Sequence, residues 1–405
     1  MSNERKKNSE NSSKTLSLFD EGTMHELLME DLMLESMDEP QTTNKLKAAN
    51  SETDDTDVAP TLGEWKRLYE AAIEFRDLAA WNLLYEDQLF GVVNPEDGEV
   101  GYCSVMGASG EFHAIAIYRG GEGLLSYERM KRQGDDAKHD GLGDPDVFLG
   151  QKALMASFEG SKDVDRRDRE VFKALGLRFR GNHAWPILRS YEPGCVPWFL
   201  NAKECRFLTH ALEQTITVIQ RVKENPNLFD ERPGCILTRT TMNSDQTSEW
   251  VDQWLTWSSL EDEINDTPIM YPSVEVDEMR LKRAMRSGRS SGVWEVDIFY
   301  APFSVHDGAG ERPYFPRLML CVHHSSGMIL SAHPADRDAE ASEFVEQFVS
   351  TIEQHEVYPD QIVVRQQSVA ELFYTIADVI DAELLVADFL PGIEMVREEM
   401  LGFMG

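Results

Sequence analysis

The chain has 405 residues, of which 39 are Lys or Arg and 72 are Asp or Glu, so its net charge at neutral pH is −33. This charge opposes binding to phosphate backbones over a broad surface, and it argues against a general nucleic-acid-binding protein. Hydrophobic residues make up 41% of the chain, which is typical of a globular protein long enough for two cores. No apolar run approaches the roughly 20 residues of a membrane span. No apolar stretch follows the basic N-terminal residues either, so we expect neither a membrane segment nor a signal peptide.

Cysteine usage indicates a reducing compartment. The five cysteines are far apart, and no two have the spacing of a metal-binding pair. An odd number without such spacing predicts reduced thiols in a cytoplasmic protein. These residues are Cys103, Cys195, Cys205, Cys235 and Cys321.

Residues 1–58 have the composition of a disordered acidic tail, because Ser, Asn, Thr, Glu and Asp dominate. Within them, Met24–Met37 (MHELLMEDLMLESM) places Met and Leu side chains along one side of a short helix. This helix could fold on the groove of a protein partner. It could equally be a nascent helix without a partner, or a helix that packs on its own domain.

Residues 59–227 are predicted to form an N-terminal α+β domain. An amphipathic helix (Leu62–Leu78) is followed by strands separated by clear turn sequences, and a long amphipathic helix (Asn201–Lys223) closes the domain. The elements expected between them are strands at Gln88–Val93, Val100–Met106, Phe112–Tyr118, Lys152–Phe158 and Asn182–Ser190, and helices at Leu124–Lys131 and Asp163–Leu175.

Three segments of this domain carry residues that could bind a ligand. Arg119–Gly123 is a glycine-rich stretch between a strand and a helix, but it lacks a full phosphate-binding fingerprint, so plain turn glycines are favoured. Asp135–Asp146 collects aspartates without the spacing of a calcium loop, which favours a surface loop over a cation site. His183, in the expected strand beside Trp185, is interpreted as a packed histidine rather than a ligand.

Residues 228–405 are predicted to form a C-terminal domain. Two strands at Gly234–Thr241 and Ser248–Trp257 are expected to make a small antiparallel element. Met279–Ser291 then carries a basic cluster in an acidic chain, consisting of Arg280, Lys282, Arg283, Arg286 and Arg289. The cluster could hold nucleic acid or an acidic partner. Alternatively, and preferably, it neutralises the acidic residues of its own domain.

The chain from Gly292 to Gly405 follows the order β-β-β-α-β-α-β-α. A hairpin-linked run of strands followed by β-α-β crossovers predicts a mixed five-stranded sheet with flanking helices, and hence an α+β protein with two α/β domains. The order is similar to that of the ribonuclease-H-like fold. The elements expected here are strands at Val293–Phe303, Arg317–His324, Met328–His333, Gln361–Val364 and Glu383–Ala387, and helices at Ala339–Gln354, Ser368–Ile380 and from Leu390 onward.

The resemblance to that fold can be tested at its catalytic positions. Such enzymes bring several carboxylates together on two Mg²⁺ or Mn²⁺ ions, and Asp297, Glu343 and Glu398 are the candidates in this sequence. However, Arg365 stands after the fourth strand, where the fold's pattern has an aspartate, and a cation there would repel the metals. We therefore favour solvated helix acids, with Asp297 on the polar side of its strand, no cofactor and no catalysis.

Two longer stretches resemble uncharacterised bacterial domain families. Trp65–Met106, with LFGVVNPEDGEVGYCSVMG followed by AIYRGGEG, is similar to one family. RPYFPRLMLCVHHSSGMIL, YPDQIVVR and DFLPGIEMVREEM are similar to a second family that often follows the first. In the second family, the position after the second strand is often acidic, whereas this chain has His323 and His324. Neither resemblance implies an activity.

These observations predict a cytoplasmic two-domain protein that acts by binding, in a regulatory or assembly role, with a catalytically degenerate ribonuclease-H-like domain. A divergent metal-dependent nuclease or phosphotransfer enzyme is the alternative. In that case Asp297, Glu343 and Glu398 would bind the metals, and the cluster at residues 280–289 would hold the nucleic acid.

Overall fold

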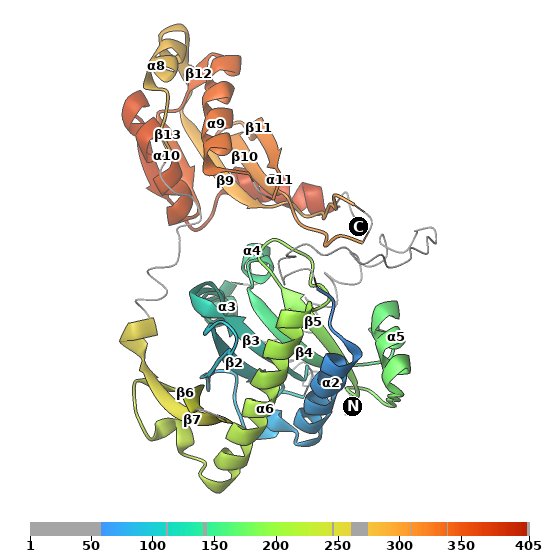
Figure 1. Ribbon diagram of the computed structural model, residues 1–405. Coiled ribbons are helices and arrows are strands. Elements are labelled where there is room, and N and C mark those ends of the chain that lie inside the picture. The colour runs from blue at the N-terminus through green and yellow to red at the C-terminus, as the bar shows by residue number, and fades with distance from the viewer. Residues whose placement is uncertain are drawn as a thin grey trace, which may run out of the picture. The chain divides into compact units, whose positions relative to one another are not determined.

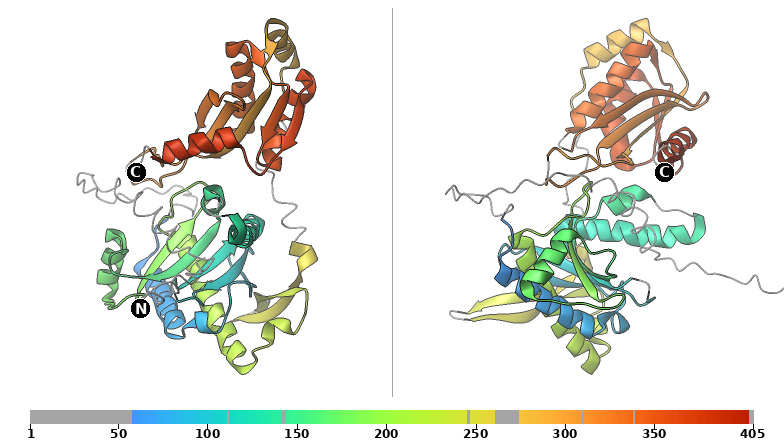
Figure 2. Two further views of the ribbon diagram at one scale, coloured as in Figure 1. Left: turned by 180° about the vertical axis from the view of Figure 1, so that it is seen from behind. Right: turned by 90° about the vertical axis from the view of Figure 1, so that its right-hand side faces the viewer.

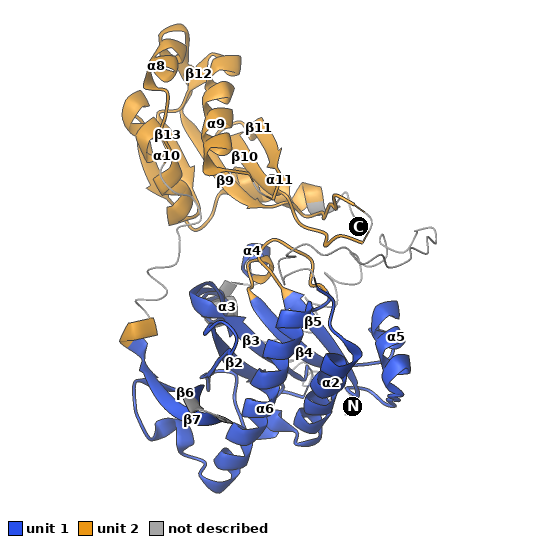
Figure 3. Ribbon diagram, in the orientation of Figure 1, with its two compact units in different colours: residues 1–147, 153–190, 199–257 blue, residues 148–152, 191–198, 258–405 orange. Residues whose placement is uncertain are grey.

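The computed structural model describes residues 58–402 except 111, 141–143, 245–246, 261–273, 309 and 338. The predicted tail and its segment Met24–Met37 lie outside the described residues. The chain divides into two compact units (Figure 3), which are described one at a time. Unit 1 contains residues up to 147, 153–190 and 199–257, and unit 2 contains residues 148–152, 191–198 and those from 258 onward. Within the described ranges, no helix combines the length and the apolar character that crossing a membrane requires.

Unit 1 is built on a seven-stranded sheet with the strand order β5-β4-β3-β2-β1-β6-β7. Neighbouring strands run antiparallel from β1 to β4, whereas β1 and β6 are parallel. The strands are β1 (Phe90–Val93), β2 (Val100–Met106), β3 (Ala114–Arg119), β4 (Ala153–Glu159), β5 (Trp185–Tyr191), β6 (Cys235–Ser244) and β7 (Thr247–Thr256). The helices up to residue 257 are α2 (Leu62–Asp77), η3 (Ala80–Asn82), α3 (Gly120–Asp140), α4 (Pro145–Leu149), α5 (Arg166–Leu175), α6 (Ala202–Glu224) and η4 (Leu228–Asp230).

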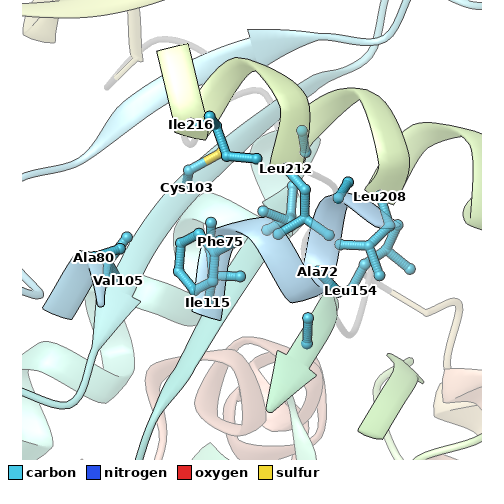
Figure 4. Close-up of a cluster of buried hydrophobic side chains, with 14 of the residues drawn as sticks. Ala72, Phe75, Ala80, Cys103, Val105, Ile115, Leu154, Leu208, Leu212 and Ile216 are labelled. Atoms are coloured by element: carbon cyan, nitrogen blue, oxygen red, sulfur yellow. The ribbon is translucent and has the colours of Figure 1, made fainter. Parts of the chain in front are cut away.

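The main core of unit 1 lies between the sheet and the helices α2 and α6. Figure 4 shows Phe75 of α2 and Leu212 of α6 among apolar side chains of the strands, such as Ile115. Alternate strand residues face the opposite side, where the ring of Tyr118 contacts that of Tyr127 on α3, with centroids 5.2 Å apart. Helices α2 and α6 therefore lie on one face of the sheet, and α3 lies on the other.

The hairpin β6–β7 corrects the expected domain boundary. Residues from 228 onward were expected in the C-terminal domain, but β6 pairs with β1 and adds two strands to the sheet of unit 1. Trp250 and Trp254 of β7 pack against the core of this unit. The pairing brings Thr238 so close to Gly91 that a Cβ at residue 91 would lie 2.7 Å from the Thr238 hydroxyl oxygen. Glycine on β1 therefore permits a long-range contact that no local signal reveals.

Two of the ligand-binding interpretations change with the structure of unit 1. Strand β3 ends at Arg119 and α3 begins at Gly120, so the glycine-rich segment is the first turn of a helix rather than a loop. The same helix runs to Asp140, into the segment expected as an acidic loop. His183 precedes β5 in a left-handed conformation with φ of 55°, and its ring contacts that of His113 at 4.9 Å.

Unit 2 contains the predicted mixed five-stranded sheet, with the order β11-β10-β9-β13-β14. The first three strands are antiparallel, and β13 and β14 run parallel to β9. The expected order of strands and helices is confirmed. The strands are β9 (Val293–Tyr300), β10 (Arg317–His323), β11 (Met328–Ala335), β13 (Gln361–Val364) and β14 (Glu383–Val386), with a small pair β8 (Arg289–Ser290) and β12 (Val357–Tyr358). Among the described residues, the helices packed on this sheet are α8 (Glu278–Ser287), α9 (Ala341–His355), α10 (Gln367–Ile380) and α11 (Pro391–Gly402).

Helices cover both faces of this sheet. On one face, Trp294 of β9 packs with Phe348 of α9 and Phe373 of α10, and α8 adds Leu281 to the same cluster. On the other face α11, labelled in Figure 1 and drawn in red in Figure 2, packs on Phe299 and on strand β10. Because β9 is the central strand, both of its rows of side chains are buried.

Candidate functional site

Two acidic residues of the central strand are buried. Glu295 is 1% exposed and Asp297 is 0% exposed, and as alternate residues they point to the same face of β9, the face that α11 covers. Asp297 shares the polar side of its strand with Glu295, as expected, but α11 covers that side and keeps it from solvent. Buried carboxylates require partners, because desolvation of an unpaired charge is very costly.

Asp297 has two arginines as partners. Its Oδ2 atom lies 2.9 Å from Nη2 of Arg365 and 4.0 Å from Nη1 of Arg397. Glu394 on α11 is close to both guanidinium groups, with its Oε1 atom 3.7 Å from Arg365 Nη1 and 3.8 Å from Arg397 Nη1. Arg397 also stacks over the ring of Phe299 at 4.6 Å. Two carboxylates and two guanidinium groups thus alternate, and their charges balance locally.

The strand register explains why Arg365 reaches Asp297. β13 runs parallel to β9, and Val364 pairs with Val296. The next residue along, Arg365, therefore comes level with Asp297. Its side chain is only 13% exposed. The position after the fourth strand of the sheet is thus adjacent to the Asp297 carboxylate.

Glu295 fixes the start of α11. Its Oε2 atom accepts hydrogen bonds from the backbone amides of Gly392 (2.8 Å) and Ile393 (3.0 Å). Its Oε1 atom lies 2.5 Å from Nδ1 of His324. A carboxylate at a helix N-terminus satisfies amides that have no partner within the helix, and it interacts favourably with the helix dipole. A strand residue therefore caps a helix that is distant in sequence.

Glycine at position 392 allows this close approach. A Cβ there would lie 2.9 Å from Cγ1 of Val322 and 3.0 Å from Oε2 of Glu295. Real Cβ atoms essentially never approach another atom within 3.0 Å, so a side chain at residue 392 would require Val322, Glu295 or the start of α11 to shift. The close packing of Val322 and Glu295 thus explains why DFLPGIEMVREEM has glycine at position 392.

The three carboxylates proposed as metal ligands do not come together. Glu343 is on α9, which covers the opposite face of the sheet from α11, and its Oε1 atom lies 2.7 Å from Nε2 of His333. Glu398 is exposed on α11. In the part of the chain that the structure describes, no group of three or more His, Cys, Asp or Glu residues is arranged to hold a metal ion.

The basic cluster contains one residue that is bonded to a neighbouring helix and four that are exposed. Arg280 on α8 binds α9 through Glu346, through Glu353 at 2.8 Å and through Ser350 at 3.0 Å. The hydrogen bonds to Glu353, the largest cause, and to Glu346 raise the pKa of Arg280. Lys282 pairs with Glu278 in its own helix. Arg283, Arg286 and Arg289 are exposed.

Sequence reasoning missed Glu295, Arg397 and His324 as members of the site. Polar residues alternating with Trp294, Val296 and Ile298 are typical of a half-exposed strand. The one local contrary signal is Phe299, which continues the acidic row and belongs to the apolar cluster under α11.

The comparisons with known proteins agree with the two stretches picked out in the sequence. Residues 65–239 match the sequence model of a domain of unknown function, DUF7309, and residues 280–401 match that of another, DUF6930. No curated protein and no solved structure matches the chain. Two distinct domain families of unknown function, DUF7309 and DUF6930, therefore lie in tandem in this chain.

Proposed function

We propose that this protein acts by binding, in a regulatory or assembly role in the cytoplasm, and that its second unit is a ribonuclease-H-like scaffold without a catalytic metal centre. The strand order β11-β10-β9-β13-β14, with three antiparallel strands followed by two that run parallel to β9, supports the scaffold. The arrangement around Asp297 supports the lack of catalysis.

The ion pair between Asp297 and Arg365 is the observation that carries the proposal. A two-metal nuclease needs carboxylates that converge on cations, but here the Asp297 carboxylate contacts one guanidinium at 2.9 Å and a second at 4.0 Å. A divalent ion about 4 Å from one guanidinium would be repelled by about 8 kcal/mol, twice the value for two unit charges at an effective dielectric constant of 20. The arginines thus take the electrostatic place of a metal.

Cleavage assays with matched variants test this proposal. Single-stranded DNA, single-stranded RNA and an RNA–DNA hybrid would be incubated with wild type and Asp297→Asn, each with Mg²⁺ or Mn²⁺. We expect no metal-dependent cleavage above background, and no shift of the thermal midpoint on adding either metal. Equal cleavage by both proteins marks a contaminant. Cleavage by wild type that Asp297→Asn abolishes would show that the site is catalytic.

Exposed basic residues at the end of α8 and in β8 are the alternative contact, for nucleic acid or an acidic partner. Arg283, Arg286 and Arg289 are exposed, whereas Arg280 is occupied by α9. Glu353 and Glu356 line the same surface hollow as Arg283, so the local charge is mixed and favours an internal, charge-balancing role over broad nucleic-acid binding. The segment Met24–Met37 stays a predicted docking helix for a protein partner.

A further inference from the structure

Strand β14 leaves one edge of the unit 2 sheet open. It is the last strand in the sheet order, and among the described residues it pairs only with β13. The amides of Glu383 and Ala387 donate to the carbonyls of Asp360 and Val364 on the β13 side. Because peptide groups alternate along a strand, the N–H and C=O groups of the even-numbered residues, Leu384 and Val386, point away from the sheet.

Apolar side chains accompany this open edge. Leu385 is 40% exposed, Val386 is 48% exposed, and Phe389 just beyond the strand is 65% exposed. A single exposed apolar residue is ordinary, but three of them beside unpaired strand groups form a surface suited to another strand.

The opposite edge of the same sheet, strand β11, has features that hinder the addition of another strand, whereas β14 lacks them. Proteins block edge strands with proline, charges, bulges or a covering helix. Strand β11 contains Pro334, and its register with β10 shifts at Cys321 and Val322. A helix packs beside each edge strand, α9 beside β11 and α10 beside β14, so the helices do not distinguish the two edges. The outward-facing part of β14, Leu384–Val386, has no proline, charge or register shift.

The charge around the edge defines its partner. Asp381, Glu383 and Asp388 are exposed on either side of the apolar residues. From Met328 to the end of the sequence the only Lys or Arg residues are Arg337, Arg365 and Arg397, and two of these contact Asp297. A second copy of this chain would place the same three carboxylates against each other, whereas a basic segment would complement them.

We propose that β14 binds an extended segment of a partner protein as an added strand, and that this segment alternates apolar residues with Lys or Arg. This inference rests on the proposed binding function and names the kind of partner that is bound. It involves neither Asp297 nor Arg365, so peptide binding and metal-dependent cleavage are tested separately, and either result stands without the other.

Residue-resolved amide exchange on the full chain tests the proposal. The probe is a capped peptide, Lys-Val-Lys-Val-Lys-Val-Lys, and the matched control is Glu-Val-Glu-Val-Glu-Val-Glu. At a peptide concentration of ten times Kd, exchange of the Leu384 and Val386 amides is expected to slow about elevenfold, because about one molecule in eleven stays free. The amides of Glu383 and Ala387 already donate within the sheet, so their exchange should change far less.

Two exposed substitutions on opposite edges complete the design. Val386→Lys adds a cation to the open edge and is expected to weaken binding at least about tenfold, or about 1.4 kcal/mol. Ile329→Lys, on β11, where residue 329 is 47% exposed, should bind as wild type does. Absence of slowing at Leu384 and Val386, or equal weakening by both substitutions, would overturn the proposal. Concentration-dependent dimerisation that only Val386→Lys abolishes would also overturn it, in favour of a second copy as the occupant.

Discussion

Asp297 and Arg365 form a buried pair whose value differs from that of a surface salt bridge. Asp297 is fully buried and the Arg365 side chain is 13% exposed, so both charges lose most of their hydration on folding. The attraction between such charges roughly offsets the cost of burying them, but removing one partner leaves the other uncompensated. The pair therefore adds little net stability to the fold, but a fold that separated the two residues would be strongly destabilised.

We expect Arg365→Met to destabilise unit 2 by about 3–5 kcal/mol, because Asp297 would lose its closest counter-charge. The double variant Asp297→Leu with Arg365→Met should be less destabilised than Arg365→Met alone. Amide exchange of β9, measured where it proceeds through unfolding of unit 2, gives these free energies. Arg283→Met, at an exposed position, is the control and should change little. A double variant as unstable as the sum of both single variants would rule out the coupling.

At the residue scale, the sequence placed Arg365 after the fourth strand, where a cation would repel metals, but it predicted neither the ion pair of Arg365 with Asp297 nor the burial of the two residues. A cation after the fourth strand could be read from the order of elements alone. The burial depends on α11 covering β9, and the contact of Glu295 with Gly392 joins residues 97 positions apart. Local patterns carry no signal for such a contact.

Helix α8 is an element whose stability depends on its neighbours. It spans ten residues, fewer than a helix needs to be stable alone in water. Leu281 is fully buried in the unit 2 core, and Arg280 joins the helix to Glu346 and Glu353 of α9. The hydrogen bond from Arg280 lowers the pKa of Glu353 below its ordinary value of 4.5.

This contact makes the docking of α8 depend on pH. Because the folded pKa of Glu353 is below its unfolded value, its contribution is fully present above pH 4.5 and is lost as the pH falls through the folded pKa. We expect the amide protection of α8, corrected for intrinsic exchange rates, to decrease in that acidic range before that of α9. Arg280→Ala should lower the protection at pH 7 and flatten its acid dependence. Unchanged protection in Arg280→Ala would assign the docking to Leu281 alone.

Elements with strong local signals were the ones predicted well. All five strands of the unit 2 sheet and its helices α9, α10 and α11 follow from period, turn residues and proline positions. The strands β6 and β7 were also expected as an antiparallel pair, but they were assigned to the wrong domain. Their membership depends on the parallel pairing of β1 with β6, which joins distant parts of the chain.

At the scale of the whole molecule, the five cysteines are distributed over both units. Cys103 and Cys205 are buried in unit 1, and Cys195 and Cys321 are buried in unit 2. Burial raises the pKa of each of these four thiols, to about 12 for Cys205. Cys235 is partly exposed at the start of β6. All five are free thiols, as predicted from their spacing.

We expect about one thiol per chain to react with a thiol reagent at pH 8 in the native protein, because only the thiolate attacks and four thiols are buried with raised pKa values. All five should react after unfolding in urea. Cys235→Ser should remove the fast phase, whereas Cys103→Ser should leave it intact. A fast phase that persists in Cys235→Ser would show that one of the buried thiols is accessible in solution.

The capping of α11 by Glu295 also has a consequence for synthesis. At about 5–20 residues per second, the ribosome makes Gly392 roughly 5–20 seconds after the strand that caps it. During that interval the nascent chain carries two acidic side chains on a strand that no helix yet shields. Until α11 is made, no helix covers that face of the unit 2 sheet, so Glu295 and Asp297 keep the hydration that they lose in the finished protein.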